Sequence, residues 1–80
     1  MNRNVGAAAK AVAVDVSSSD QELVEASRAI FVGGAGNLAV TMEGGGDITF
    51  TGVTAGSVLV IAVSSVLTSG TTATNIVALF

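Results

Sequence analysis

The chain contains no cysteine, histidine, proline, tryptophan or tyrosine, and only 11% of its 80 residues are charged. Without cysteine no disulfide can form, and without cysteine or histidine a zinc site lacks its usual ligands. The same absences remove most of the side chains that act as nucleophiles or general bases. The six acids show no spacing that favours a catalytic carboxylate pair. We therefore predict that the protein is not an enzyme and holds no cofactor or metal.

Positive charge is also scarce, because Arg3, Lys10 and Arg28 are the only basic residues and the net charge is −3. Nucleic-acid binding needs clustered basic residues that release counterions, so nucleic acid is not an expected partner. The longest apolar run, Val58–Val63, has six residues, whereas a membrane-spanning helix needs about 20. Lys10 interrupts the small-residue run Ala7–Ala9, so no signal peptide is predicted. We expect a soluble protein made in a cytoplasm, without a membrane partner.

Apolar residues make up half of the chain, but most of them are small. Alanine and valine supply 26 of the 40 apolar positions, and phenylalanine supplies three. A chain of this length buries only about 60–65% of the surface that it exposes when unfolded. Small scaffolds with so little bulk need a staple, a metal or partner copies. Self-association is the route that the composition leaves open.

Alternation of apolar residues predicts strands through most of the chain. Valine occupies every second position of Ala11–Val16, which is the period of a strand with one buried face. Leu38, Val40 and Met42 share one face of the next clear strand, and Ile48 and Phe50 are expected to point inward. The predicted strands are Ala11–Val16, Ala29–Val32, Leu38–Met42, Ile48–Thr51 and Asn75–Phe80.

Glycine-rich turn signals recur about every ten residues, at Gly33–Asn37, Glu43–Asp47 and Gly52–Gly56. The pattern predicts an all-β fold, a small antiparallel β-sandwich or barrel with glycine-rich turns. The first signal, Gly34-x-Gly36-x-x-Ala39, loosely matches a dinucleotide-binding motif but lacks the following helix and acid, so it is interpreted as a hairpin turn. Glu43 and Asp47 offer too few ligands for calcium.

Two segments leave alternatives open. Ser19 and Glu22 fit a capping box, so Asp20–Val24 forms either a single helical turn or a polar loop. Ser57–Leu67 is interpreted as a strand rather than a buried helix, because β-branched residues dominate it. The run Val58–Val63 is prone to aggregation, so we expect it to be buried within the subunit or between subunits.

The ends of the chain hold the candidate interface residues. Residues 1–10 are predicted to form a flexible N-terminal arm, and residues 11–80 a single β domain. The arm carries Arg3 and Lys10, which are candidates for contact with acids on a partner protein. The apolar C-terminus, Leu79 and Phe80, is expected to be packed in a core or between subunits.

The run Ser27–Thr41 (SRAIFVGGAGNLAVT) resembles the central segment of the head spike base proteins of gene transfer agents. Small capsid-decorating proteins of tailed phages look similar. Three further parts of the chain match the same family: Ala11–Val14 with Asp20 and Leu23, Phe50–Leu59, and Gly70–Leu79. The resemblance covers residues 11–80, which is nearly the whole chain.

The resemblance implies a structural virion protein on the outer capsid surface. Such a protein binds the major capsid protein as a homo-oligomer, a trimer or a pentamer, and cements the shell. A vertex spike base that anchors a host-binding fibre protein is the alternative. A carbohydrate-binding module is a lesser alternative, since the chain has no tryptophan or tyrosine on which a sugar could stack.

Overall fold

The structure is a computed structural model that describes residues 10–80, and within this range it contains eight strands and no helix. No segment of that range forms a helix long and apolar enough to cross a membrane. The strands are β1 (Ala11–Val14), β2 (Gln21–Glu22), β3 (Ala29–Gly34), β4 (Gly36–Met42), β5 (Asp47–Val53), β6 (Ser57–Leu59), β7 (Val63–Val66) and β8 (Thr74–Leu79). The all-β prediction is confirmed. The predicted division into an arm and a domain stays a prediction, because residues 1–9 lie outside the described residues.

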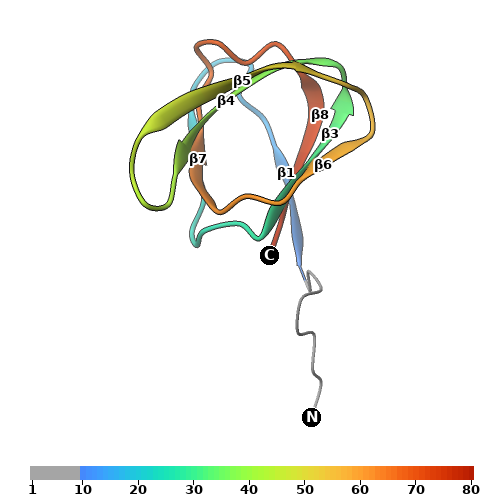
Figure 1. The fold of residues 1–80 in the computed structure, drawn as a ribbon. Coiled ribbons are helices and arrows are strands. Elements are labelled where there is room, and N and C mark those ends of the chain that lie inside the picture. Colours follow the sequence, from blue (N-terminus) through green and yellow to red (C-terminus); the bar gives the residue numbers. More distant parts are fainter. Residues whose placement is uncertain (1–9) are drawn as a thin grey trace.

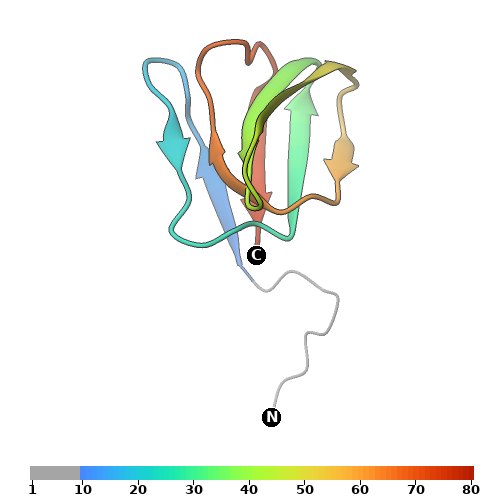
Figure 2. The same ribbon diagram turned by 60° about the vertical axis from the view of Figure 1, so that its left-hand side comes forward.

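The strands form two four-stranded antiparallel sheets that face each other (Figures 1 and 2). Sheet A has the order β1-β8-β3-β6, and sheet B has the order β2-β7-β4-β5. The first strand therefore pairs with the last, the second with the seventh, and so on inward, in the pairs β1·β8, β2·β7, β3·β6 and β4·β5. This is the pairing of one long hairpin that is folded over into two sheets. This nesting across two sheets is the topology of a jelly roll.

Between the sheets lies a core of aliphatic side chains without a fully buried aromatic ring. Strand alternation directs every second residue of β3, β4 and β8 into it. Phe50 and Phe80 are only partly buried and pack against its margin. The core residues are Ile30, Val32, Leu38, Val40, Val63, Val66, Ala73, Ile76 and Ala78. The core is as poor in bulk as the composition predicted.

Gly33–Asn37 forms no hairpin turn, and this part of the prediction is wrong. β3 continues through Gly34 and β4 begins at Gly36, so the chain passes from sheet A to sheet B with one residue between the strands. The glycines permit a close approach rather than a turn. A Cβ atom on Gly33 would lie 2.9 Å from the Asn75 Cβ, and one on Gly36 would lie 2.6 Å from the Ala73 nitrogen. The glycine pattern between Glu43 and Asp47 does form the predicted turn, and β4–β5 is the only sequential hairpin among residues 10–80.

The helical turn that was left open at Asp20–Val24 does not form, because Gln21 and Glu22 pair with β7 as strand β2. The side-chain amide of Gln21 also binds the neighbouring sheet. Its oxygen accepts a hydrogen bond from the Asp15 backbone nitrogen at 2.9 Å, and its nitrogen donates to the Ala13 carbonyl at 3.3 Å. Gln21 thus caps the free edge of β1 as a peptide group would and links the two sheets.

Ser57–Leu67 is extended, as expected, but it forms two strands in different sheets rather than one. The Ile61 backbone nitrogen donates to the Leu59 carbonyl at 3.0 Å, and this tight turn sends the chain from β6 into β7. Val60 lies at the bend and is 85% exposed, while Val58 on the edge strand β6 is 53% exposed. Burial of the whole Val58–Val63 run within the subunit is therefore ruled out.

Two other residues that were predicted to be buried, both on edge strands, remain exposed. Ile48 lies opposite Val40 on the inner side of sheet B, but β5 is an edge strand and Ile48 remains 49% exposed. Val12 on the edge strand β1 is 38% exposed, although Val14 and Val16 pack against the core as predicted. In both cases alternation correctly predicted that the side chain lies on the inner side of its sheet. The other sheet does not extend far enough to bury that side chain.

Candidate interaction surfaces

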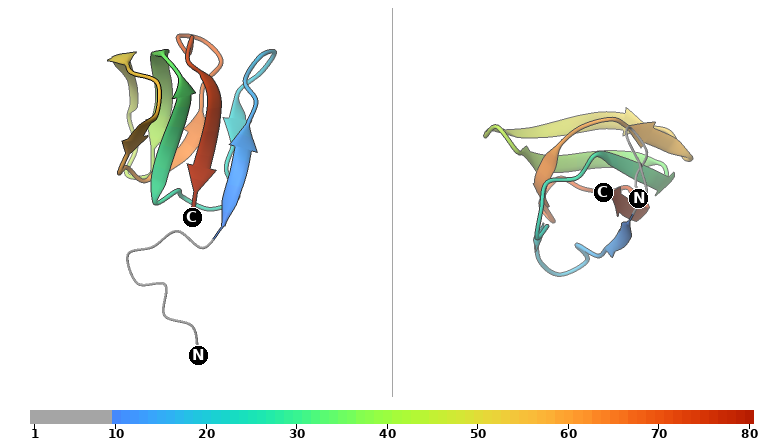
Figure 3. Two further views of the ribbon diagram at one scale, coloured as in Figure 1. Left: turned by 90° about the vertical axis from the view of Figure 1, so that its right-hand side faces the viewer. Right: turned by 90° about the horizontal axis from the view of Figure 1, so that it is seen from below.

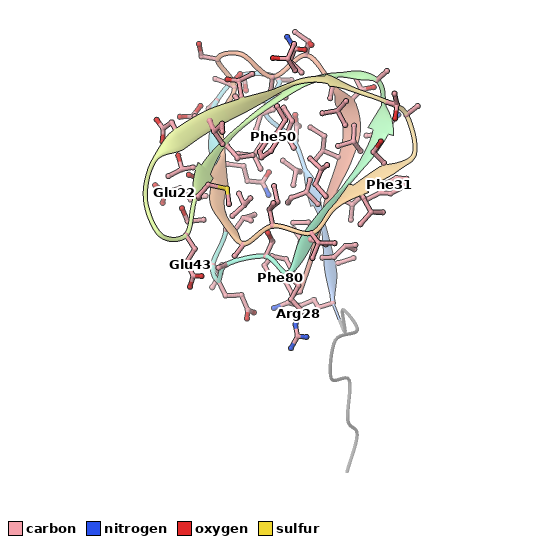
Figure 4. The ribbon with its side chains drawn as sticks, viewed as in Figure 1. Glu22, Arg28, Phe31, Glu43, Phe50 and Phe80 are labelled. Atoms are coloured by element: carbon pink, nitrogen blue, oxygen red, sulfur yellow. The ribbon has the colours of Figure 1, made fainter. Side chains whose placement is uncertain are left out.

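The end of the sandwich at which β1 begins and β8 finishes is here called the terminal end (Figure 1). Backbone pairing brings Lys10 beside Leu79 and Phe80 at this end, where Figure 4 shows Phe80. The Phe80 backbone nitrogen donates to the Lys10 carbonyl at 2.7 Å, and the Lys10 nitrogen donates to the Phe80 carbonyl at 3.3 Å. The Lys10 Nζ lies 5.1 Å from the centre of the Phe80 ring. An ammonium over an aromatic face is attracted by the partial negative charge on that face of the neutral ring.

Lys10 also contacts Glu25, whose carboxylate lies 2.8 Å from the Lys10 Nζ. Both side chains are more than half exposed, and such pairs contribute about 0–1 kcal/mol to stability. Glu25 lies in the connection from β2 to β3, which also carries Arg28. The Arg28 backbone nitrogen donates to the Leu79 carbonyl at 2.7 Å, so both basic residues of the described range lie at the terminal end (Figure 4).

Two valines at loop tips of the same end are almost fully accessible. Val24, in the β2–β3 connection, is 103% exposed, and Val60, in the β6–β7 bend, is 85% exposed. A large apolar side chain held at an exposed loop tip gains nothing for the fold of one copy. Glu43 lies at this end too, since its backbone nitrogen donates to the Ala62 carbonyl in the β6–β7 connection at 2.9 Å (Figure 4). The terminal end thus combines apolar tips with accessible groups of both charges, which suits contact with another protein.

The structure brings Lys10, Leu79 and Phe80 together, while Arg3 lies outside the described residues. Sequence reasoning missed Glu25, Arg28 and the two exposed valines as parts of the same end. Their separation along the chain hides this proximity, and only the β2–β3 connection and the β6–β7 bend create it. Whether these residues contact a capsid stays a prediction.

The opposite, distal end carries a shallow depression of about 290 Å³ between residues 14–17 and residues 71–76. Ser17 holds the pKa of Asp15 below its usual value of 3.8, because its backbone N–H and its hydroxyl donate hydrogen bonds to the carboxylate. Thr71, Thr72 and Thr74 also line the depression, but no aromatic residue does. The site therefore lacks the stacking surface that the carbohydrate-binding alternative requires.

No group of three or more metal-binding side chains occurs within residues 10–80. Glu43 and Asp47 flank an exposed turn, and the Asp47 carboxylate accepts a hydrogen bond from the Thr41 hydroxyl at 2.7 Å. The motif Gly34-x-Gly36-x-x-Ala39 connects β3 to another strand and not to a helix. It therefore lacks the helix N-terminus that binds a pyrophosphate in the dinucleotide-binding fold.

One solved structure is similar to this chain in both sequence and fold. No protein-family model and no curated protein matches it. Among solved structures, it matches a chain of the capsid of a native gene transfer agent (GTA) particle, a structure computed with fivefold (C5) symmetry. The two chains are 32% identical, the match covers 91% of this chain and 83% of the other, and the TM-score is 0.76. This chain belongs to the family of that GTA capsid protein.

Membership of this GTA capsid family confirms the broader part of the sequence resemblance, which pointed to gene transfer agents and phage capsids. It supports a structural, capsid-associated protein. The solved relative does not distinguish a spike base from a decoration protein, so that narrower assignment belongs to the proposal below.

Proposed function

We propose that this chain is a structural component of a phage-like particle, bound to the outer surface of the assembled capsid as a homo-oligomer that cements the shell. The observation that carries the proposal is the 32% identity to a GTA capsid chain over 91% of this chain. A protein that binds only the assembled state stabilises that state by mass action. A compact all-β domain is suited to this role.

The terminal end is the surface that we propose to contact the major capsid protein. It carries Val24 and Val60, whose side chains are unburied in one copy, and both basic residues of the described range. The predicted N-terminal arm, with Arg3, would add to the same contact, because β1 begins at this end. The distal end offers Asp15 and Asp20 but no basic residue within residues 10–80.

A binding experiment with particles that lack this chain tests the proposal. The purified wild-type chain should co-sediment with such particles. Val60→Asp should lower its occupancy, because the new carboxylate would be desolvated in the contact. Ala55→Asp is the matched control, since it adds the same charge to an exposed loop at the distal end. If the wild-type chain does not bind, the proposed function is wrong; if Ala55→Asp alone loses binding, the terminal end is not the contact.

Deletion of residues 1–9 tests the arm separately. The truncated chain should remain folded and should occupy fewer sites on the particles, because Arg3 and every other arm residue except Lys10 are removed. Unchanged occupancy would refute a role for this segment.

A vertex spike base that anchors a fibre protein is the second candidate, because the run Ser27–Thr41 resembles the central segment of head spike base proteins. A density map of the parent particle separates the two roles. Density at many sites across the shell would support the cement role. Density restricted to the fivefold vertices, with a fibre above it, would support the spike base.

A further inference from the structure

The outer face of sheet A carries apolar side chains on all four strands, and Asn75 of β8 adds a polar one at the distal end (Figure 3, left, views this sheet). Ile30, Ile76 and Ala78 are buried between the sheets, so the alternating residues of the same strands point outward. The strand registers align these outward residues in two rows, and none of them belongs to the core or its margin. The rows are Ala13–Val77–Phe31–Val58 and Ala11–Leu79–Ala29.

The outer face of sheet B has the opposite character. The register places Glu22, Ser65, Thr41 and Asp47 in one row across its four strands. Thr49 follows on β5, and Glu43 adds a third carboxylate in the adjoining turn. This face is polar and acidic, as expected of a sheet that faces water. The sandwich is therefore amphipathic as a whole, with one outer face that resembles a protein interior.

The charge distribution argues that a second copy of this chain covers sheet A. Two copies that met through sheet B would bring the carboxylates of Glu22 and Asp47 toward those of the partner. Two copies that meet through the uncharged sheet A keep these carboxylates on opposite sides of the assembly, which minimises like-charge repulsion. A strongly charged partner would find no complementary group in either apolar row.

The size of the face agrees with an interface between copies. A sheet of four strands, about 4.8 Å apart, is roughly 19 Å wide. The largest apolar patch of a typical monomer covers about 300–600 Å², whereas a specific interface buries about 800 Å² on each partner. The seven apolar residues of the two rows come from all four strands and can form the apolar core of such an interface, with Lys10 at its polar rim.

We propose that the apolar outer face of sheet A is the surface through which copies of this chain associate. The inference deepens the proposed function, on which it rests, because it assigns the surface that makes the capsid component a homo-oligomer. Covering sheet A also supplies the burial that the aliphatic core of one copy lacks.

Sedimentation of the full chain with two matched lysine variants tests the proposal. Val58→Lys adds a charge to the apolar face on the edge strand β6, and Thr49→Lys adds the same charge to the polar face on the edge strand β5. Both positions are exposed in one copy, so both variants should fold. The wild-type chain and Thr49→Lys should sediment as the same oligomer. Val58→Lys should weaken association by more than about tenfold and approach the monomer mass of 7.8 kDa.

A labelling experiment decides the matter even if Val58→Lys does not fold. Because the chain has no cysteine, Ala13→Cys or Thr49→Cys introduces a single thiol at a position that is exposed in one copy. In the free oligomer, a maleimide should modify Ala13→Cys at least about tenfold more slowly than Thr49→Cys, because a covered thiol is not accessible.

Several outcomes would overturn the proposal: a monomeric wild-type chain, an oligomer retained by Val58→Lys, or equal labelling of the two thiols. Protection of Ala13→Cys only on particles would assign sheet A to the capsid instead. Failure of the proposed function is a separate result, since an oligomer with a protected sheet A that never binds particles would leave this interface intact.

Discussion

At the residue scale, Gly36 and Asn37 lie where the chain passes from sheet A to sheet B, and they contact the segment that precedes β8. The Asn37 carbonyl accepts hydrogen bonds from the backbone nitrogens of Thr72 and Ala73 at 2.9 and 3.0 Å. Its side-chain oxygen accepts another from the Gly52 nitrogen at 3.0 Å. The two chain segments approach so closely that Gly36 has no space for a Cβ atom.

Gly36→Ala should therefore lower the free energy of unfolding by about 1–3 kcal/mol or more, because its Cβ would collide with backbone atoms that cannot rotate away. Gly44→Ala is the matched control, since nothing lies within 4 Å of a Cβ at that position. Denaturant unfolding of both variants measures the difference. Equal stabilities would show that the crossing is not as tight as described.

A single side chain, Asp15, makes the stability of the fold depend on pH. Hydrogen bonds from the Ser17 backbone N–H and hydroxyl lower the pKa of Asp15 below 3.8 in the folded chain. Its contribution to stability is therefore fully present above the unfolded pKa of 3.8 and is lost as the pH falls through the folded pKa. A titration of the Asp15 carboxyl carbon by NMR should show a midpoint below 3.8. A midpoint at or above this value would contradict the hydrogen bonds.

At the element scale, the β2–β3 connection is fastened to the β6–β7 bend by one buried side chain. Ser27 is 3% exposed. Its hydroxyl donates to the Ile61 carbonyl at 3.0 Å and accepts from the Val63 nitrogen at 3.1 Å. The Ser27 nitrogen in turn donates to the Val63 carbonyl at 3.0 Å. These bonds satisfy the polar backbone groups that the break between β6 and β7 leaves without strand partners.

Ser27→Ala should cost about 1–3 kcal/mol of stability, because the Val63 N–H and the Ile61 carbonyl would stay buried without a partner. Ser69→Ala, at an exposed loop position, should change stability by less than about 0.5 kcal/mol. Thermal unfolding compares the two variants. If Ser27→Ala is as stable as Ser69→Ala, the hydroxyl of Ser27 does not fasten these elements.

At the scale of the whole molecule, one sandwich presents an apolar face, a polar face and two chemically different ends. The core holds no fully buried aromatic ring, so folding of one copy gains little beyond its entropic cost. Association through sheet A would add apolar burial to every copy. Stability and oligomeric state are then coupled.

The melting temperature of the wild-type chain should therefore rise with protein concentration, because folding and association share one equilibrium. Differential scanning calorimetry over about a hundredfold range of concentration measures this shift. Thr49→Lys should show the same slope, and Val58→Lys should show none. A concentration-independent melting temperature for the wild-type chain would contradict the coupling.

Sequence reasoning predicted the strands and several of their faces from local pattern. Leu38 and Val40 are buried as expected, and Glu43–Asp47 forms the expected turn between β4 and β5. It failed where the outcome depended on what lies opposite. Ile48 points to the predicted face of its strand, but no side chain of the other sheet buries it. Gly33–Asn37 has the composition of a turn, but its glycines allow the chain to pass close to a neighbouring segment as it crosses between the sheets.

The candidate site at the terminal end was likewise predicted only in part from the sequence. Lys10, Leu79 and Phe80 were chosen for their place near the chain ends, and antiparallel pairing of β1 with β8 brings them together. Arg28, Val24 and Val60 join them through connections whose course no local pattern encodes. Loop residues distant in sequence share a surface only when the order of strands is known.

The sequence by itself determined that this protein is all-β and that most of its apolar side chains are small. These properties follow from residue types and from an alternation of period two, both of which are local. Only the tertiary structure decided which strands share a sheet, and therefore which apolar face is covered by the other sheet and which remains outside. Alternation places side chains on a common face, but burial depends on what packs against that face, which is a non-local property.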